Sequence, residues 1–187
     1  MTQAEIKQLI QKQRTFFHSD ATLDVEYRIH ALQKLKACIL KYENEINIAI
    51  RADLGKCAFE SYMCETGLVL SELTYMIRHT RKFAKERTVR TPLAQFHSRS
   101  YQKPSPCGVA LITSPGNYPF MLTLEPLIDA LAAGNTAILK PSAYSAHTTA
   151  LISRMIQECF DEKYVAVVTG GREENNFLLN EHFDYIF

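Results

Sequence analysis

Two short turns carry the residue types in this chain that are best suited to binding a ligand. Ser114-Pro115-Gly116-Asn117 follows the apolar run 109–112, and Lys140-Pro141-Ser142 follows the apolar run 136–139. Their amide, ammonium and hydroxyl groups all donate hydrogen bonds. In a sheet of parallel strands, ligands bind beyond the carboxyl ends of the strands. The two turns therefore predict a single ligand crevice.

The residues around these turns have the order of one strand–helix–strand unit. Residues 109–112 are continuously apolar, as a strand covered on both faces must be. We expect a helix over 123–133, with Pro126 in its first turn, where a missing N–H group costs little. Gly134 ends that helix, and 136–139 form the second strand.

The same alternation continues toward the C-terminus. It predicts a helix opening at Ser145 or His147, a strand at 164–168, a short helix at 173–180 and a strand at 183–187. Strands that alternate with helices predict a parallel sheet with right-handed crossovers. The last strand has the composition of a buried one. We therefore expect that the chain stops within its sheet, as a cut or truncated product would.

The N-terminal part has a helical pattern instead. Apolar side chains recur every three or four residues over 3–17, 22–54 and 58–83, which predicts three helices, with Gly67 as a possible break in the third. The second would be one continuous helix of about seven turns. Residues 95–102 alternate weakly in polarity and predict an exposed strand.

Composition excludes several classes of function. The chain has 187 residues, of which 47 % are hydrophobic and 22 % charged, with a net charge of +1. This balance gives no electrostatic case for binding nucleic acid. No apolar run is long enough to span a membrane, and the N-terminus lacks the apolar core of a signal peptide. The five cysteines are scattered without a metal-ligand spacing, so we expect no metal site, reduced thiols and a cytoplasmic location.

Several motifs, in order and spacing, identify the chain as resembling the aldehyde dehydrogenase superfamily, in its class 3-like branch for fatty, aromatic and coniferyl aldehydes. The resemblance covers nearly the whole chain and matches the N-terminal portion of that family. It implies an α/β fold, in which a helical segment 1–90 packs on an incomplete Rossmann-like NAD(P)-binding domain 91–187 as one structural unit. The motifs that carry it are SPGNYPF, LAAGNTAILKPS, VVTGG, QRTFFHS, ADLGK, ETGLVLSE and TPLAQFHSRSYQKPSPCGV.

The resemblance also implies an activity, the oxidation of a small aldehyde to a carboxylic acid with NAD or NADP as the cofactor. Asn117 matches the asparagine whose side-chain amide donates to the developing oxyanion, a type of donor worth about 10²–10³ in rate. Lys140 matches the lysine that binds the adenosine ribose. Other matched positions line the cofactor: Thr113, Ser114 and Pro115 beneath it, and Ser142, Gly170 and Gly171 on the adenosine side.

Two positions depart from the family pattern. Gly116 stands where the family has a tryptophan, which removes an aromatic wall and loosens the backbone before Asn117. Ala143 stands where a glutamate usually accepts the ribose 2′-hydroxyl and repels a 2′-phosphate. We therefore expect NADP to be tolerated as well as NAD.

The family's cysteine nucleophile, its general-base glutamate and its catalytic domain have no counterpart in this sequence. Cys38, Cys159, Cys57, Cys64 and Cys107 fall on helices or at the amino end of a strand, and none is expected to attack an aldehyde. We therefore expect the chain alone to be inactive. An open fourth strand also predicts a homo-oligomer or a self-associating fragment.

Two alternatives belong to other classes. One is a non-catalytic module, derived from the same family, that binds a nucleotide or pairs with a complementary chain. The other is a product of gene disruption with no selected role. Binding of NAD, NADP or adenosine phosphates would favour the first alternative over the second.

Overall fold

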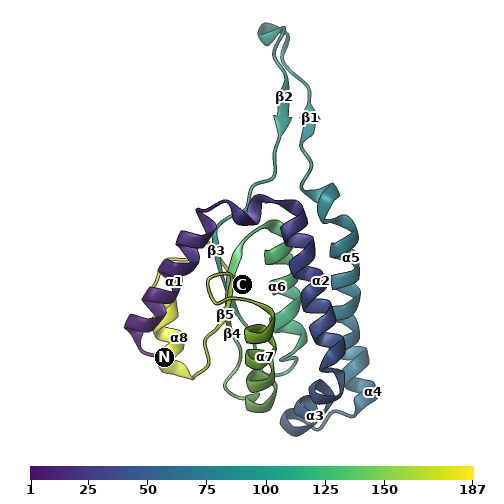
Figure 1. The fold of residues 1–187 in the computed structure, drawn as a ribbon, viewed down its shortest axis with the longest axis vertical. Helices are drawn as coiled ribbons and strands as arrows, with labels where there is room; N and C mark the ends of the chain where they lie inside the picture. The colour runs from purple at the N-terminus through teal and green to yellow at the C-terminus, as the bar shows by residue number, and fades with distance from the viewer.

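A four-stranded parallel sheet of order β5-β4-β3-β6 forms the centre of the computed structural model, which describes residues 1–187. Helices lie on both faces of this sheet (Figure 1). The predicted α/β class, with a helical N-terminal region and a parallel sheet, is confirmed. The strands are β3 (Val109–Thr113), β4 (Thr136–Lys140), β5 (Val165–Val167) and β6 (Tyr185–Ile186).

The alternation of side chains along the central strands supplies two hydrophobic layers. Leu111 and Ile138 point to one face, where they pack against α1 (Gln3–Phe17) and α8 (Arg172–Leu179). Ile112 and Leu139 point to the other face, in a cluster of 26 buried residues. Because both faces are covered, the strands are apolar along their whole length rather than at every second position.

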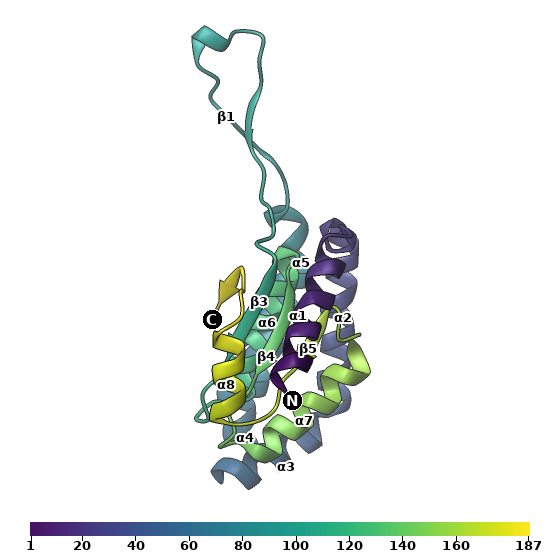
Figure 2. The same cartoon turned by 90° about the vertical axis from the view of Figure 1, so that its left-hand side faces the viewer.

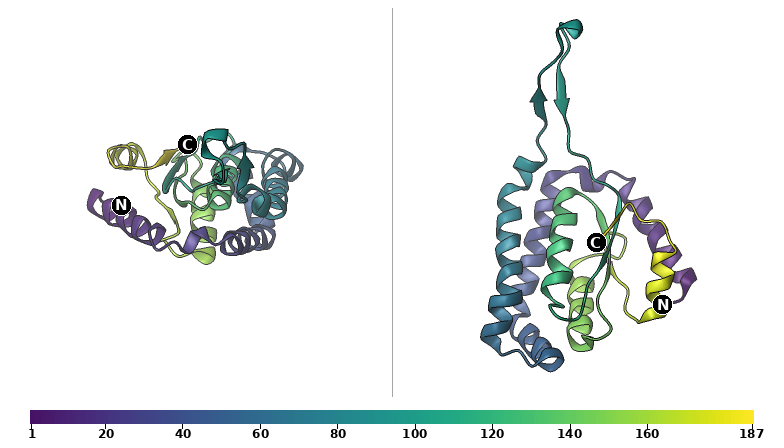
Figure 3. Two further views of the ribbon diagram at one scale, coloured as in Figure 1. Left: turned by 90° about the horizontal axis from the view of Figure 1, so that it is seen from above. Right: turned by 180° about the vertical axis from the view of Figure 1, so that it is seen from behind.

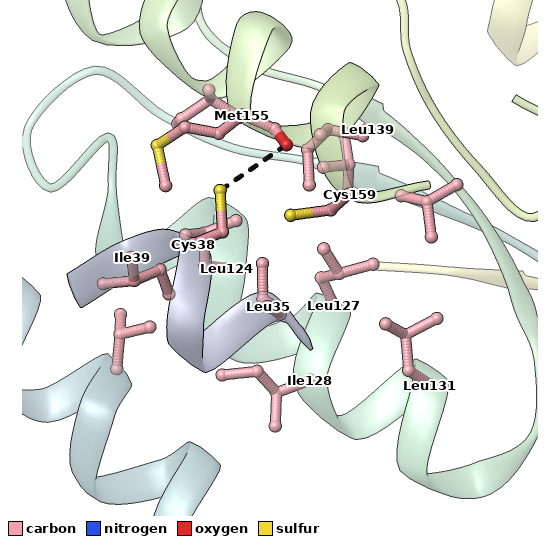
Figure 4. Packing of buried hydrophobic residues seen from close by; sticks show 14 of the residues in the cluster. Leu35, Cys38, Ile39, Leu124, Leu127, Ile128, Leu131, Leu139, Met155 and Cys159 are labelled. Atoms are coloured by element: carbon pink, nitrogen blue, oxygen red, sulfur yellow. Dashed lines mark hydrogen bonds between the residues drawn. The ribbon is translucent and has the colours of Figure 1, made fainter. Parts of the chain in front are cut away.

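The larger cluster joins the sheet to the N-terminal helices. Its members come from β3, β4, β5 and from the helices that cover this face (Figures 1 and 2). Cys38, Met155 and Cys159 meet at its centre, where the Cys38 thiol contacts the Met155 carbonyl at 3.8 Å (Figure 4). The covering helices are α2 (Val25–Lys41), α3 (Glu43–Leu54), α5 (Gly67–Phe83), α6 (Met121–Ala133) and α7 (Ala146–Cys159).

The prediction of one long helix over 22–54 was wrong, because the chain turns at Tyr42. This residue leaves helical geometry, with φ −98° and ψ 9°, and separates α2 from α3. Its phenol donates to the Glu158 carboxylate on α7 at 2.6 Å, so a tertiary contact accompanies the break. Gly55, with φ 72°, ends α3 in the left-handed conformation.

The third helical region is divided close to Gly67. It begins with α4 (Ala58–Ser61), widens into the π-helical turn η2 (Tyr62–Thr66), and continues as α5. A Cβ atom at Gly67 would lie 2.7 Å from the Tyr62 carbonyl oxygen. Glycine therefore lets the chain return from the wide turn to the α-helix without a clash.

A two-stranded arm rises from the body between α5 and β3 (Figures 1 and 3). It is formed by β1 (Arg87–Val89) and β2 (Ser100–Gln102), which pair antiparallel. The predicted strand over 95–102 is thus shorter than expected, and a 3₁₀ turn, η3 (Leu93–Gln95), lies near the tip. The arm exposes Phe96 to 76 %.

One further expectation was wrong in detail. Helix α6 begins at Met121, so Pro126 lies in its interior rather than in the first turn. Strand β6 forms the edge of the sheet, where Tyr185 and Ile186 are about half exposed, in agreement with the expected open fourth strand. No helix of the structure is long and apolar enough to cross a membrane.

Gln13 provides a test of how α1 is attached to the sheet. Its side chain is fully buried, and its amide nitrogen donates to the carbonyls of Ala137 at 2.9 Å and Glu162 at 3.0 Å. We expect Gln13→Leu to lower the free energy of unfolding by about 1–2 kcal/mol, because both hydrogen bonds are lost. Thermal unfolding should show a Tm lower by about 2–8 °C. Gln11→Leu, on the exposed side of the same helix, should leave Tm nearly unchanged.

Candidate functional site

A cavity of about 350 Å³ lies at the carboxyl ends of β3 and β4 and beside the turn that follows β5. It brings together residues that are up to 62 positions apart in the sequence, from Thr113 to Asn175. Six of the seven residues predicted to bind a cofactor line it, and Pro115 is the exception. The lining residues are Thr113, Ser114, Lys140, Pro141, Ser142, Ala143, Tyr144, Gly170, Gly171, Arg172 and Asn175.

Lys140 is the buried cation of this cavity, with only 3 % of the residue exposed. Its ammonium donates to the carbonyl oxygens of Pro141 at 3.0 Å and Gly170 at 2.8 Å. Burial lowers the pKa of this ammonium, and the nearby Glu174 carboxylate opposes that change. An ammonium carries three donors, so one remains for a ligand hydroxyl or phosphate oxygen.

Ser142 is held in the turn after β4 by hydrogen bonds to its hydroxyl and to its carbonyl oxygen. Its hydroxyl oxygen accepts from the Tyr144 N–H group at 3.2 Å, and its carbonyl accepts from the Thr149 hydroxyl at 2.9 Å. The hydroxyl proton of Ser142 is not used in either bond. It is therefore available to a ligand in the cavity, while Tyr144 projects beside it with 95 % of its surface exposed.

The glycine turn after β5 also lines the cavity. Gly170 has φ +134°, and a Cβ atom there would lie 2.2 Å from the carboxyl carbon of Glu174. The Glu174 carboxylate accepts from the Gly171 N–H group at 2.8 Å. Only glycine at position 170 combines this backbone conformation with so close an approach of a side chain.

Thr113 and Ser114 line the cavity, but their hydroxyl protons are already engaged. Thr113 donates to the Phe187 carbonyl at 2.7 Å. Thr123 donates to the Pro119 carbonyl, so the 2.6 Å contact between the Ser114 and Thr123 hydroxyls uses the Ser114 proton. These two residues can therefore contact a cofactor through their surface but cannot donate hydrogen bonds to it in this arrangement.

Asn117 lies on an exposed loop beyond β3 and is not part of the cavity lining. Its side-chain amide makes no hydrogen bond within the chain, and its backbone carbonyl accepts from the Lys56 ammonium at 3.0 Å. The preceding Gly116 carbonyl accepts from the Ser145 hydroxyl at 3.1 Å. The loop is thus held by its backbone, which leaves the Asn117 amide free to donate to a reacting oxygen.

A buried ion pair beneath this loop was missed by the sequence analysis. Glu65 is fully buried, and its carboxylate accepts from the Lys56 ammonium at 2.6 Å and from the Phe120 N–H group at 2.9 Å. The Lys56 ammonium also lies 4.0 Å from the centre of the Tyr118 ring. The sequence pattern around Lys56 and Glu65 gives no indication of a buried ion pair. The π-helical turn that directs Glu65 inward has no signature in the sequence.

The cysteines are placed unfavourably for attack on an aldehyde. Cys38 and Cys159 are buried in the core, where burial raises the pKa of Cys159 to about 12 and also raises the pKa of Cys38 (Figure 4). Cys107 is at the amino end of β3, and its N–H group donates to the Asn135 side chain at 2.7 Å. Cys57 is exposed and does not line the cavity.

Two other features lie outside the site. The helix start at His147 is occupied within the chain, because the N–H groups of His147 and Thr148 donate to the Asp53 carboxylate at 3.1 and 2.7 Å. A larger groove of about 420 Å³ lies between β6 and α6, and it contains none of the predicted site residues. No group of three or more His, Cys, Asp or Glu side chains is arranged to hold a metal ion.

Comparison with known proteins gives consistent matches. The profile of the "Aldehyde dehydrogenase family" matches residues 1–186. The 4,4'-diaponeurosporen-aldehyde dehydrogenase of Staphylococcus aureus is 41 % identical over 97 % of this chain and 40 % of its own length. Aldehyde dehydrogenase family 3 member A2 of Rattus norvegicus is 35 % identical over 95 % of this chain and 37 % of its own. The chain therefore spans about two fifths of the length of these relatives.

The fold agrees with these matches. The solved substrate-bound state of Staphylococcus aureus AldH superposes with a TM-score of 0.95 and 41 % identity, over 97 % of this chain and 40 % of that one. The helical N-terminal region and the four-stranded sheet thus match the N-terminal part of that structure.

The Lys56–Glu65 pair predicts a measurable link between stability and the Asn117 loop. We expect Glu65→Gln to lower the free energy of unfolding by about 3 kcal/mol, because it leaves the Lys56 ammonium largely buried without its partner. Adding Lys56→Met should cost less than the sum of the two single changes. Urea unfolding measures the cost, and amide exchange at 117–121 should become faster in Glu65→Gln. Glu60→Gln, at an exposed position, is the control, and equal effects of the two changes would contradict the assignment.

Proposed function

Because the chain belongs to the aldehyde dehydrogenase family, we propose that it supplies the adenosine side of the cofactor crevice and the oxyanion donor of an NAD(P)-dependent enzyme. That enzyme would oxidise a small aldehyde to a carboxylic acid. The observation that carries the proposal is the cavity at the strand ends. It unites Lys140 and Ser142, at the end of β4, with Gly170 and Gly171, in the turn after β5.

The residues present fit the adenosine part of such a cofactor. Lys140 offers one free ammonium donor, and Ser142 offers a hydroxyl proton, to a ribose or phosphate. Gly170 and Gly171 carry no side chain that would fill the adjacent space. The cofactor, when bound, supplies the acceptor for the hydride removed from the substrate. Hydride transfer requires that the cofactor be bound in a fixed position, and these residues would bind its adenosine part.

Asn117 would act on the substrate rather than on the cofactor. Its side-chain amide is unpaired and exposed, and the loop that carries it is fixed by Lys56 and Ser145 through backbone carbonyls. A donor fixed in advance stabilises a developing oxyanion without reorganising during the reaction. The nucleophile and the general base would lie in a part of the enzyme that this chain does not contain. The chain alone would then bind cofactor without turning over aldehyde.

The second candidate is a binding module that has no catalytic role. The observation in its favour is that eleven residues of this chain line the cavity and none of them is a cysteine. In either case we propose a cytoplasmic location, where five free thiols persist without forming disulfides.

We also propose that the chain forms homo-oligomers through its arm. The arm extends away from the body and packs against no other element, and it exposes Leu93 to 89 % and Phe96 to 76 % (Figure 2). Apolar side chains on a projecting hairpin gain free energy when a second copy covers them. No nucleic acid is a partner in this proposal, because the chain is nearly neutral.

Cofactor binding can be tested on the chain directly. We expect calorimetric titration with NAD⁺ to show binding, and Lys140→Met to weaken it about tenfold or more, because a charge-assisted hydrogen bond is removed. Lys7→Met, on the exposed surface, should not change the affinity. Absence of heat at millimolar NAD⁺ would refute a retained crevice. NADH formation from an aldehyde by this chain alone would refute the assignment of the nucleophile to a missing part.

The proposed role of the arm can be tested by measuring the mass of the particle that the chain forms in solution. Light scattering should give a particle larger than the 21.3 kDa monomer. Replacing Leu93 and Phe96 together with serine should shift the population toward the monomer without unfolding it, because neither side chain packs on the body. As a control, Leu179→Ser removes an exposed leucine from α8 and should leave the mass unchanged. A monodisperse monomer of the unmodified chain would contradict the proposal.

A further inference from the structure

Positive charge is concentrated in one part of this nearly neutral chain. Residues 78–103 contain eight of the 21 Lys and Arg residues but only one of the 20 Asp and Glu residues, so they carry a net charge of +7 and the rest of the chain −6. This stretch comprises the end of α5 and the whole arm. The arm therefore carries positive charge away from an acidic body (Figure 1).

Most of these cations have no acidic partner within the chain. Arg81 is paired with Glu26 at 2.6 Å, and Lys103 lies 3.8 Å from Glu86. The cations that make no ion pair are all exposed, and they are Arg78, Lys82, Lys85, Arg87, Arg90 and Arg99. Because cations gathered without acids between them repel one another, contact with an anionic surface would stabilise this end of the molecule.

The end of the arm adds apolar side chains to this charge. Leu93 and Phe96 lie in the turn between β1 and β2, and they are exposed to 89 % and 76 %. Arg90 follows β1 and Arg99 precedes β2, so a cation stands on each side of this apolar turn. Apolar side chains next to exposed cations are typical of segments that lie in the interface of an anionic bilayer.

We propose that the arm docks this chain on an anionic lipid bilayer, with Leu93 and Phe96 in the bilayer interface and the cations of 78–103 against lipid phosphates. Burial of apolar surface and attraction of basic residues to anionic lipids both contribute to such binding. A nucleic acid would engage the cations but offers no apolar layer for Leu93. A bilayer contacts both the cations and the apolar turn.

This docking goes beyond the proposed function and does not involve the cofactor cavity. The proposed self-association uses the apolar turn but gives no role to the six unpaired cations. Only one partner at a time can cover Leu93 and Phe96. We therefore expect bilayer binding and self-association to compete, so that vesicles with anionic lipid draw the chain out of its oligomer.

Co-sedimentation of the whole chain with vesicles measures the docking. We expect vesicles of phosphatidylcholine mixed with phosphatidylserine to bind the chain at least about tenfold more tightly than vesicles of phosphatidylcholine alone. Binding should weaken as salt is raised, because ions screen exposed charges. Equal binding to the two kinds of vesicle, or binding to neither, would overturn the proposal. Retention by heparin without binding to the mixed vesicles would also overturn it, in favour of a soluble polyanion.

Two pairs of substitutions separate the cations of the arm from charge in general. Arg87→Gln with Arg90→Gln removes two cations whose side chains make no hydrogen bond, and should weaken binding to the mixed vesicles at least about tenfold. Lys7→Gln with Lys34→Gln makes the same change of net charge at exposed positions of α1 and α2, and should leave binding nearly unchanged. Neither pair should alter the mass of the self-associated particle, because the apolar turn is intact. Equal losses of vesicle binding in the two pairs would contradict docking through the arm.

A tryptophan in the apolar turn reports whether that turn enters the bilayer. The chain contains no tryptophan, so Phe96→Trp introduces a single fluorophore at the end of the arm. In a solution dilute enough for light scattering to show the monomer, the mixed vesicles should shift its emission to shorter wavelength. Phe59→Trp on α4, where the phenylalanine is also exposed to 76 %, should show no shift. An unshifted Phe96→Trp signal on bound vesicles would place the contact elsewhere and overturn the proposal.

Discussion

The parallel register of β3 and β4 is the constraint on which the candidate site depends. It pairs Thr113 with Lys140, so that the two turns following these strands emerge side by side. The Ser114 N–H group continues the pairing by donating to the Lys140 carbonyl at 3.3 Å. A slip of one residue would exchange the faces of every side chain in a strand, and would expose alternate members of both hydrophobic layers. The core therefore fixes the geometry of the cavity.

Buried charge then fixes the loops that the register brings together. Lys140 ties the end of β4 to the turn after β5 through the Gly170 carbonyl, and Glu65 ties the N-terminal helices to the start of α6 through the Phe120 N–H group. Each of these charges is costly to bury unless its hydrogen bonds are made. If the loop that supplies these hydrogen bonds moved away, the buried charge would be left without a partner. The hydrogen bonds that compensate for burial therefore also limit the motion of the site.

The parts of this fold that depend on local pattern were accessible from the sequence. Continuous apolar runs predicted β3 and β4, and the turns after them predicted where the cavity lies. The resemblance to a family, rather than any spacing, supplied the roles of Asn117 and Lys140. Those roles stay predictions, whereas the gathering of the cavity residues is a feature of the structure.

The parts that were not predicted depend on contacts between distant segments. The apolar stripe runs through Tyr42 without interruption, and the break there is accompanied by a bond from its phenol to the distant Glu158. The π-helical turn that buries Glu65 looks like ordinary helix in the sequence. Arg172 resembles a surface arginine at a helix start until β4 and the glycine turn are placed beside it. In each case the feature involves residues that lie far apart in the sequence, so a short stretch of sequence cannot predict it.

The open surfaces of the chain are separate from its cavity, and this separation has a functional consequence. The groove beside β6 and the cavity at the strand ends share no lining residue. The arm extends from the opposite end of β3, where that strand begins (Figure 1). Covering the edge strand or the arm with another chain would therefore leave Lys140, Ser142 and Arg172 unobstructed. The cavity and the open surfaces can thus be occupied independently of one another.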